Sequence, residues 1–188
     1  MKNIILLLLI TINVFSQTKN DFLDLKNINY QLLDSLVFDE AMRQRNLIGN
    51  PPVKKDNTCY IAAKYQSEYM SHFNEFSHEN TKKYNGALLK HSWDRFHFFN
   101  EKVKNKKEII GTLEILLVID NLDRKYVNLN TYSDYAKEII NFYLLSPNHK
   151  ISLLYYDEKY NLFGDFKTKY NDLTKCLYVT GLYVCSLK

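Results

Sequence analysis

The stretch Gly111-Thr-Leu-Glu-Ile-Leu-Leu-Val-Ile119 is the strongest structural signal in the chain. It is short, rich in branched apolar residues, and bounded by glycine on one side and by Asp120-Asn121 on the other. A run of this length between such boundaries favours a buried strand, and a short core helix is the alternative. The segments on either side of it therefore decide the fold class.

Three segments around this strand have apolar residues at helical intervals of three and four: residues 33–46, 58–73 and 134–145. The first must end before Gly49-Asn50-Pro51-Pro52, and Pro147 stops the third. Between the second helix and the strand, the irregular segment 79–107 contains one short predicted helix at 93–100. Two apolar stretches, 160–166 and 177–184, flank a turn-rich segment and predict a β-hairpin. This order predicts an α+β fold with helices against a small antiparallel sheet.

The composition fits one globular domain and excludes several function classes. The chain has 188 residues, of which 46% are hydrophobic and 24% charged. With only 5 glycines it has no glycine-rich phosphate loop, so nucleotide-binding fingerprints are absent. The net charge of +4 is spread along the chain, which indicates solubility and no nucleic-acid partner.

The N-terminal residues 1–16 have the pattern of a secretory signal peptide. One lysine, Lys2, precedes a largely apolar run from Ile4 to Val14, and Ser16 supplies a small residue at the expected cleavage point. The run is too short to span a bilayer, which needs about 20 apolar residues. A buried N-terminal helix or strand is the alternative. We therefore expect a secreted or periplasmic protein with no stable membrane span, in which 17–31 is a polar lead-in and 32–188 a single domain.

Export permits disulfides, but the chain has only three cysteines: Cys59, Cys176 and Cys185. Cys176 and Cys185 would lie at opposite ends of one strand and could not bridge each other. Either Cys59 pairs with one of them, or all three are reduced and buried.

Familiar catalytic motifs are absent or broken. No Gly-x-Ser-x-Gly element occurs. His78-Glu79 begins like the His-Glu-x-x-His helix of zinc proteases, but Lys82 occupies the position of the second histidine. The other histidines, His72, His91 and His97, are expected to be surface or hydrogen-bonded residues.

Three segments taken together resemble a known family. They are Asn74-Glu75-Phe76-Ser77-His78, then Glu114-Ile115 in the apolar strand, then the stretch from Phe142 to Leu154 that contains Ser146-Pro147-Asn148-His149. Their order and spacing resemble the CAP superfamily of cysteine-rich secretory, antigen-five and pathogenesis-related proteins, especially its bacterial SCP-domain branch. The resemblance also includes the family's Asn-x-x-Arg helix and its Pro-Leu, Asp and Ala-Ala positions, which correspond here to Arg43, Pro52-Val53, Asp56 and Ala62-Ala63.

The resemblance runs from Leu33 to Val184 and has departures typical of a divergent bacterial-type member. Tyr143 stands where the family has tryptophan, and Asn148 where it has glycine. The second of the family's paired glutamates falls on Ser146. The resemblance therefore implies an α-β-α sandwich with a cleft that contains His78, Glu114 and His149, without the fourth group.

These residue types point to a binding site. Two imidazoles and a carboxylate can hold zinc or another divalent metal with a position left open, or can transfer protons. We expect His78 and His149 as metal ligands and Glu114 and Ser146 as ligand-binding residues, with no catalytic residue. Alternatively, Glu114 faces water and His149 caps a loop.

The function expected from these residues is a secreted, non-catalytic binding module with an unidentified extracellular ligand. The alternative is a metal-dependent secreted hydrolase, in which a metal-bound water would attack the substrate.

Overall fold

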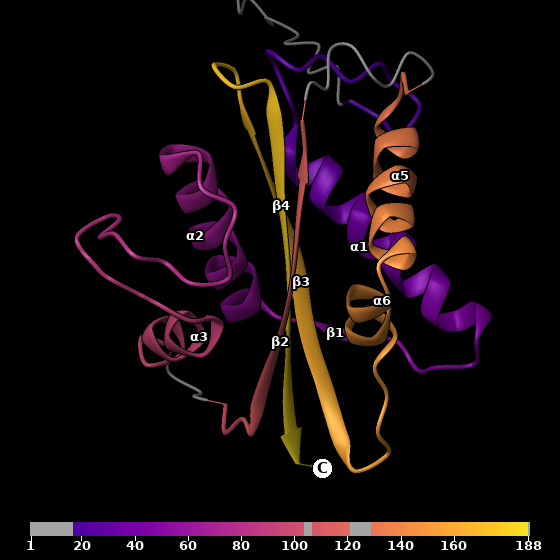
Figure 1. The fold of residues 1–188 in the computed structure, drawn as a ribbon. Helices are drawn as coiled ribbons and strands as arrows, with labels where there is room; N and C mark the ends of the chain where they lie inside the picture. The colour runs from indigo at the N-terminus through magenta and orange to yellow at the C-terminus, as the bar shows by residue number, and fades with distance from the viewer. Residues whose placement is uncertain (1–16, 104–106, 121–128, 188) are drawn as a thin grey trace, which may run out of the picture.

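The computed structural model describes residues 17–103, 107–120 and 129–187, so the predicted signal peptide at 1–16 lies outside the described residues. The elements are, in chain order, α1 (Tyr30–Leu47), β1 (Lys54–Lys55), α2 (Asn57–Phe73), α3 (Ser92–Asn100), β2 (Gly111–Ile119), α5 (Tyr132–Leu145), α6 (Pro147–Leu154), β3 (Tyr160–Asn171) and β4 (Cys176–Leu187). Figure 1 shows three layers, with the sheet between α2 and α3 on one side and α1, α5 and α6 on the other. The predicted α+β sandwich is confirmed.

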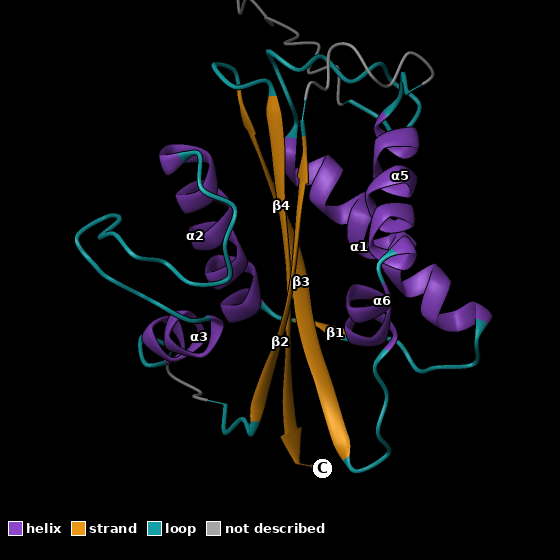
Figure 2. Ribbon diagram, viewed as in Figure 1, coloured by secondary structure: helices purple, strands orange, loops and turns teal. Residues whose placement is uncertain are grey.

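The sheet differs in detail from the expected antiparallel one. Its strand order is β1-β3-β4-β2, and β1 runs parallel to β3 through the pairs Lys54↔Phe163 and Lys55↔Gly164. The sheet is therefore mixed, although its three long strands are antiparallel. The hairpin strands β3 and β4 are each 12 residues long, so the predicted hairpin was right in place but too short. Figure 2 shows these long strands running through the middle of the molecule, between the two groups of helices.

The helices begin at side-chain caps that the sequence supplies. Asn29 accepts a hydrogen bond from the backbone of Leu32 at the start of α1, and Asp56 accepts one from the backbone of Cys59 at the start of α2. Pro147 ends α5, as predicted, and it also occupies the first turn of α6, where proline has no N–H to leave unpaired. The sequence patterns did not predict α6.

A glycine on the central strand β4 leaves room for side chains from its two neighbouring strands, β3 and β2. Gly181 pairs with Phe166 on one side and with Ile115 on the other. A Cβ atom at Gly181 would lie 2.5 Å from Cε1 of Phe166 and 2.7 Å from Cγ1 of Ile115. These two side chains are fully buried in the core between the sheet and α1, α5 and α6, so a larger residue would force them apart.

Beyond Gly164 the outer edge of β3 is covered by side chains rather than by another strand. The carboxylate of Asp34 on α1 accepts hydrogen bonds from the backbone and hydroxyl of Thr168, both at 2.8 Å, and pairs with the buried Lys167 ammonium. The Tyr30 hydroxyl accepts a bond from the backbone of Tyr170 at 3.3 Å. These contacts satisfy edge N–H groups that would otherwise be free to pair with another chain.

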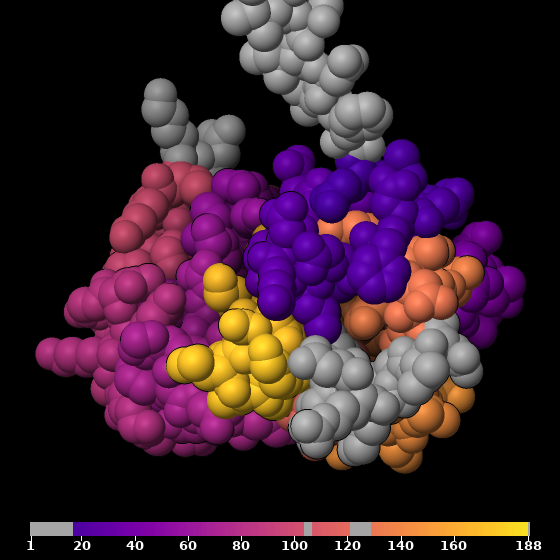
Figure 3. Space-filling view, turned by 90° about the horizontal axis from the view of Figure 1, so that it is seen from above, coloured from indigo at the N-terminus to yellow at the C-terminus, as the bar shows by residue number. Residues whose placement is uncertain are grey.

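The segment before α1 lies over one end of the sandwich, as Figure 3 shows from above. Leu23 is buried, and its backbone N–H donates to the carbonyl of Asn130 just before α5. Among the described residues no helix combines the length and apolar character needed to cross a bilayer. All three cysteines lie in the described part of the chain and are free thiols; Cys59 and Cys185 are buried as that alternative expected, whereas Cys176 is half-buried.

Candidate functional site

The centre of the site is the contact between His78 and Glu114. His78 follows α2, and Glu114 lies on β2, on the face that α2 and α3 cover. The Nδ1 atom of His78 lies 3.1 Å from Oε2 of Glu114. The Glu114 side chain is 4% exposed, whereas that of His78 is 56% exposed. The carboxylate therefore does not face open water, and the exposed imidazole is hydrogen-bonded to it from the protein side.

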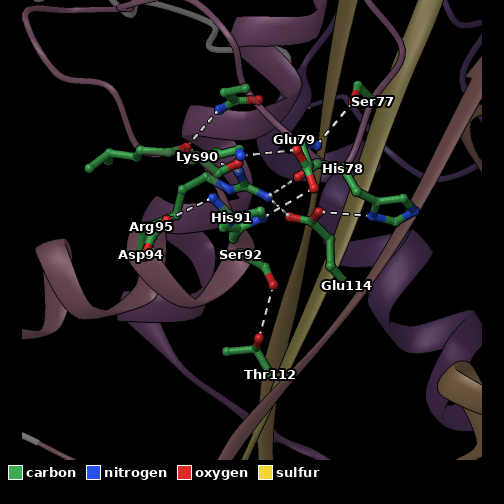
Figure 4. A network of polar contacts seen from close by, with 12 residues as sticks. Ser77, His78, Glu79, Lys90, His91, Ser92, Asp94, Arg95, Thr112 and Glu114 are labelled. Carbon is green, nitrogen blue, oxygen red and sulfur yellow. Dashed lines mark hydrogen bonds and ion pairs between the residues drawn. The ribbon is translucent and has the colours of Figure 1, made fainter.

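A buried arginine on α3 neutralises Glu114. The Nη2 atom of Arg95 donates to Oε1 of Glu114 at 2.5 Å, and the Arg95 side chain is fully buried. Nη1 donates to the carbonyls of Leu89 and Lys90, and Nη2 lies 3.4 Å from the carbonyl oxygen of His78. Figure 4 shows the guanidinium between the loop that carries His78 and the carboxylate of Glu114. This charge balance allows a carboxylate inside an otherwise apolar strand.

The geometry indicates which nitrogen of His78 is free. An ionised carboxylate only accepts hydrogen bonds, so Nδ1 of His78 carries the proton that it shares with Glu114. In Figure 4 the other ring nitrogen points away from Glu114. The Nε2 lone pair is thus available to a ligand when the ring is neutral.

His149 on α6 lies beside the same edge strand. Its ring packs edge-on against Tyr143, with 5.6 Å between the ring centroids. Burial lowers the pKa of His149, and the nearby His78 imidazole lowers it further. Tyr143 is fully buried and its hydroxyl donates to the carbonyl of Val179. Tyr143 thus fixes the position of His149 against the core.

Two other residues selected from the sequence, Ser146 and Arg43, make contacts of their own on other elements. Ser146 is half-buried between α5 and α6, where its backbone N–H donates to Tyr143 and its carbonyl accepts from Lys150. Its hydroxyl makes no capping hydrogen bond at the start of α6. Arg43 is exposed and pairs with Glu40, whereas Arg45, two residues on, is the buried arginine of α1.

Sequence reasoning missed Arg95. The short helix at 93–100 was predicted correctly, but nothing in its sequence distinguishes Arg95 from a surface residue. The available signal was indirect: a glutamate in an apolar strand needs a counterion, and an arginine on a neighbouring helix can supply it.

A complete metal site is not formed by the described side chains. In residues 17–103, 107–120 and 129–187, no group of three or more His, Cys, Asp and Glu side chains is placed to hold a metal ion. Glu114 is already engaged by Arg95 and His78 through its two oxygens. Both of its oxygens are therefore used within the protein, one of them by Nδ1 of His78.

Comparison with known proteins bears on the fold. No family model matches the sequence, and no curated protein matches it. Among solved structures, an extracellular protein containing an SCP domain from Bacillus anthracis is 17% identical, with a TM-score of 0.56 over 84% of this chain. The chain has the SCP-domain fold. It spans 41% of the length of that Bacillus protein.

A second similar solved structure comes from another organism. An outer surface protein from Borrelia burgdorferi is 15% identical, with a TM-score of 0.56 over 90% of this chain and 99% of its own. At this low sequence identity, the structural similarity is informative about the fold only. The resemblance predicted from the three sequence segments is thus supported by the three-dimensional structure.

Proposed function

We propose that this protein is an exported, non-catalytic binding module, secreted or periplasmic, whose ligand site contains His78 and His149 with Glu114 and Ser146 beside them. The observation that carries the proposal is the pair of contacts that Glu114 makes. Arg95 holds the carboxylate from the interior, and the carboxylate holds Nδ1 of His78, so that an exposed imidazole is fixed in one orientation. A fixed, solvent-facing donor atom is a feature of binding sites.

A divalent cation such as zinc fits this site, with the two imidazoles as its ligands. Histidines that bind zinc commonly donate their second ring N–H to a carboxylate, as His78 does to Glu114. The lowered pKa of His149 favours the neutral ring that a metal requires. Glu114 does not fit as a direct ligand because Arg95 neutralises it. Two protein ligands leave several coordination positions to an external molecule, which suits reversible binding.

Hydrolysis is not the function that this geometry supports best. A metal-dependent hydrolase needs a base to activate water, and Glu114 is the only carboxylate bonded to His78 among the described residues. Its two oxygens are already engaged by Arg95 and His78. Ser146 occupies the position where a second glutamate would be expected from the family resemblance.

Calorimetric titration with zinc at about pH 7.5 tests the proposal. The purified parent should bind zinc, and His78→Ala and His149→Ala should each weaken binding about tenfold or more. His72→Ala, which removes an exposed histidine from α2, is the matched control and should bind like the parent. Equal affinity in all four proteins would contradict the proposed site. Zinc-dependent cleavage of an ester or peptide that is lost in Glu114→Gln would instead establish the hydrolase.

A further inference from the structure

Among the described residues a second arginine, Arg45 on α1, is fully buried, and it lacks the counterion that Arg95 has. Arg95 pairs with Glu114, but none of the ion pairs among the described residues includes Arg45, although its residue is only 1% exposed. Its Nε atom donates to the carbonyl of Pro51, and its Nη1 atom donates to those of Leu153 and Tyr155. These carbonyls carry partial charges only, so the guanidinium keeps its net charge in the interior.

Arg45 also has an unused hydrogen-bond donor. Its Nη2 atom is buried and has no acceptor, and the hydroxyl of the buried Tyr183 likewise has no partner. Burial lowers the pKa of Arg45, the shift expected when no carboxylate offsets desolvation. An arginine nevertheless stays protonated in proteins. A buried positive charge without a counterion is costly, and an anion close to it would offset that cost.

A cavity of about 230 Å³ adjoins this arginine, on the side of the sheet opposite α2 and α3. Its lining includes Arg45, Pro51, Pro52, Lys54, Tyr156 and Asn161. Within the part of the chain that the structure describes, no acidic side chain lines it. The cavity thus combines two cations, an amide and aromatic and proline surfaces, which together suit a small molecule with an anionic group and a flat apolar part.

We propose that this cavity is a second binding site, separate from His78, for a small organic molecule that carries a carboxylate or phosphate group. The uncompensated charge of Arg45 attracts the oxyanion from beneath the cavity surface, since its Nη2 atom is itself enclosed. Lys54, which is exposed at the rim, adds attraction from the solvent side. Tyr156 is 46% exposed and offers a ring to the remainder of the ligand. The site does not depend on the proposed function of the histidines.

Thermal unfolding with benzoate and inorganic phosphate as probes tests this proposal, with sodium chloride at equal ionic strength as the reference. A ligand that binds only the folded state raises the melting temperature in a saturable way. We expect such a rise with at least one probe. Benzoate alone would assign a carboxylate ligand, and phosphate alone a phosphate ligand. No saturable rise above chloride with either probe would overturn the proposal.

Charge-reversal variants locate the site without disturbing the core. Lys54→Glu should weaken the probe's affinity at least fivefold, whereas Lys83→Glu, an equal charge change on an exposed loop lysine, should leave it unchanged. His78→Ala should also leave it unchanged, which separates this site from the proposed zinc site. Amide NMR shifts during the titration should concentrate at Tyr156 and Asn161. Equal weakening by both lysine variants, or shifts elsewhere only, would show non-specific binding and refute the site.

Discussion

The guanidinium of Arg95 lies 2.5 Å from the carboxylate of Glu114, and both side chains are almost completely buried. This pair explains how β2 can carry a charged residue on a face that packs against helices. It also makes Glu114 a positioning residue, because its other oxygen holds Nδ1 of the exposed His78. Glu114 thus links the buried Arg95 to the exposed His78 through its two oxygens.

Replacing Arg95 with methionine should destabilise the protein strongly. The change leaves the Glu114 carboxylate buried without its counterion, and loss of one partner of a buried pair costs about 3–5 kcal/mol. Urea unfolding monitored by circular dichroism measures the change. Lys64→Met is the matched control, since Lys64 is exposed and its pair with Glu68 on α2 should contribute about 1 kcal/mol or less. Similar losses in both variants would refute the buried pair.

Replacing Asp34 with alanine should uncover the outer edge of β3. The variant loses two hydrogen bonds to Thr168 and leaves the Lys167 ammonium buried, so we expect a loss of about 3–5 kcal/mol in the free energy of unfolding. Asp39→Ala, on the exposed side of the same helix, should change stability by about 0.5 kcal/mol or less. Urea unfolding of both proteins provides the test. An unchanged Asp34→Ala variant would mean that the edge needs no side-chain cover.

Asp165 should make stability depend on pH. Burial raises its pKa to about 6 in the folded protein, against 3.8 for the ordinary group. The folded state thus binds this proton more tightly than the unfolded chain, so the contribution of Asp165 to stability falls as pH rises from about 4 to about 6. Above that range the ionised carboxylate remains a cost, because it is largely desolvated.

Asp165→Asn should therefore be more stable than the parent at about pH 7.5 and similar to it at about pH 4. The amide can still accept the hydrogen bond that Asp165 receives from the backbone of Phe166. Melting temperatures at both pH values measure the effect, with Asp39→Asn as the control. A variant that is less stable than the parent at pH 7.5 would show that the charge of Asp165 is stabilising.

Elements with a regular apolar period were predictable from the sequence. The helices at 58–73 and 134–145 agree with the structure because one face of each packs against the core. The strand at 111–119 agrees because both of its faces contact apolar clusters. The two-residue strand β1 has no such period, and it forms only because β3 offers it a partner at Phe163. The helix α6 is amphipathic over too few turns for its pattern to be recognised.

The candidate site was predictable in part. His78, Glu114 and His149 were selected from the sequence, and the structure brings His78 and Glu114 into contact with His149 nearby. Arg95 was not, because its pairing with Glu114 depends on how α3 packs against β2 and not on any local motif. The burial of Arg45 likewise depends on packing, because its guanidinium donates to the carbonyls of Leu153 and Tyr155 far along the chain.

Nitrogen NMR of the histidine side chains, recorded at about pH 7.5 without and with zinc, tests the central claim most directly, namely that Glu114 orients His78 for ligand binding. We expect a proton on Nδ1 of His78, and we expect zinc to shift the Nε2 resonance of His78 and a ring nitrogen of His149 but to leave His72 unchanged. In Glu114→Gln, the preference of His78 for the Nδ1 proton should decrease. A proton on Nε2 of His78 in the parent, or rings of His78 and His149 that zinc leaves unshifted, would contradict it.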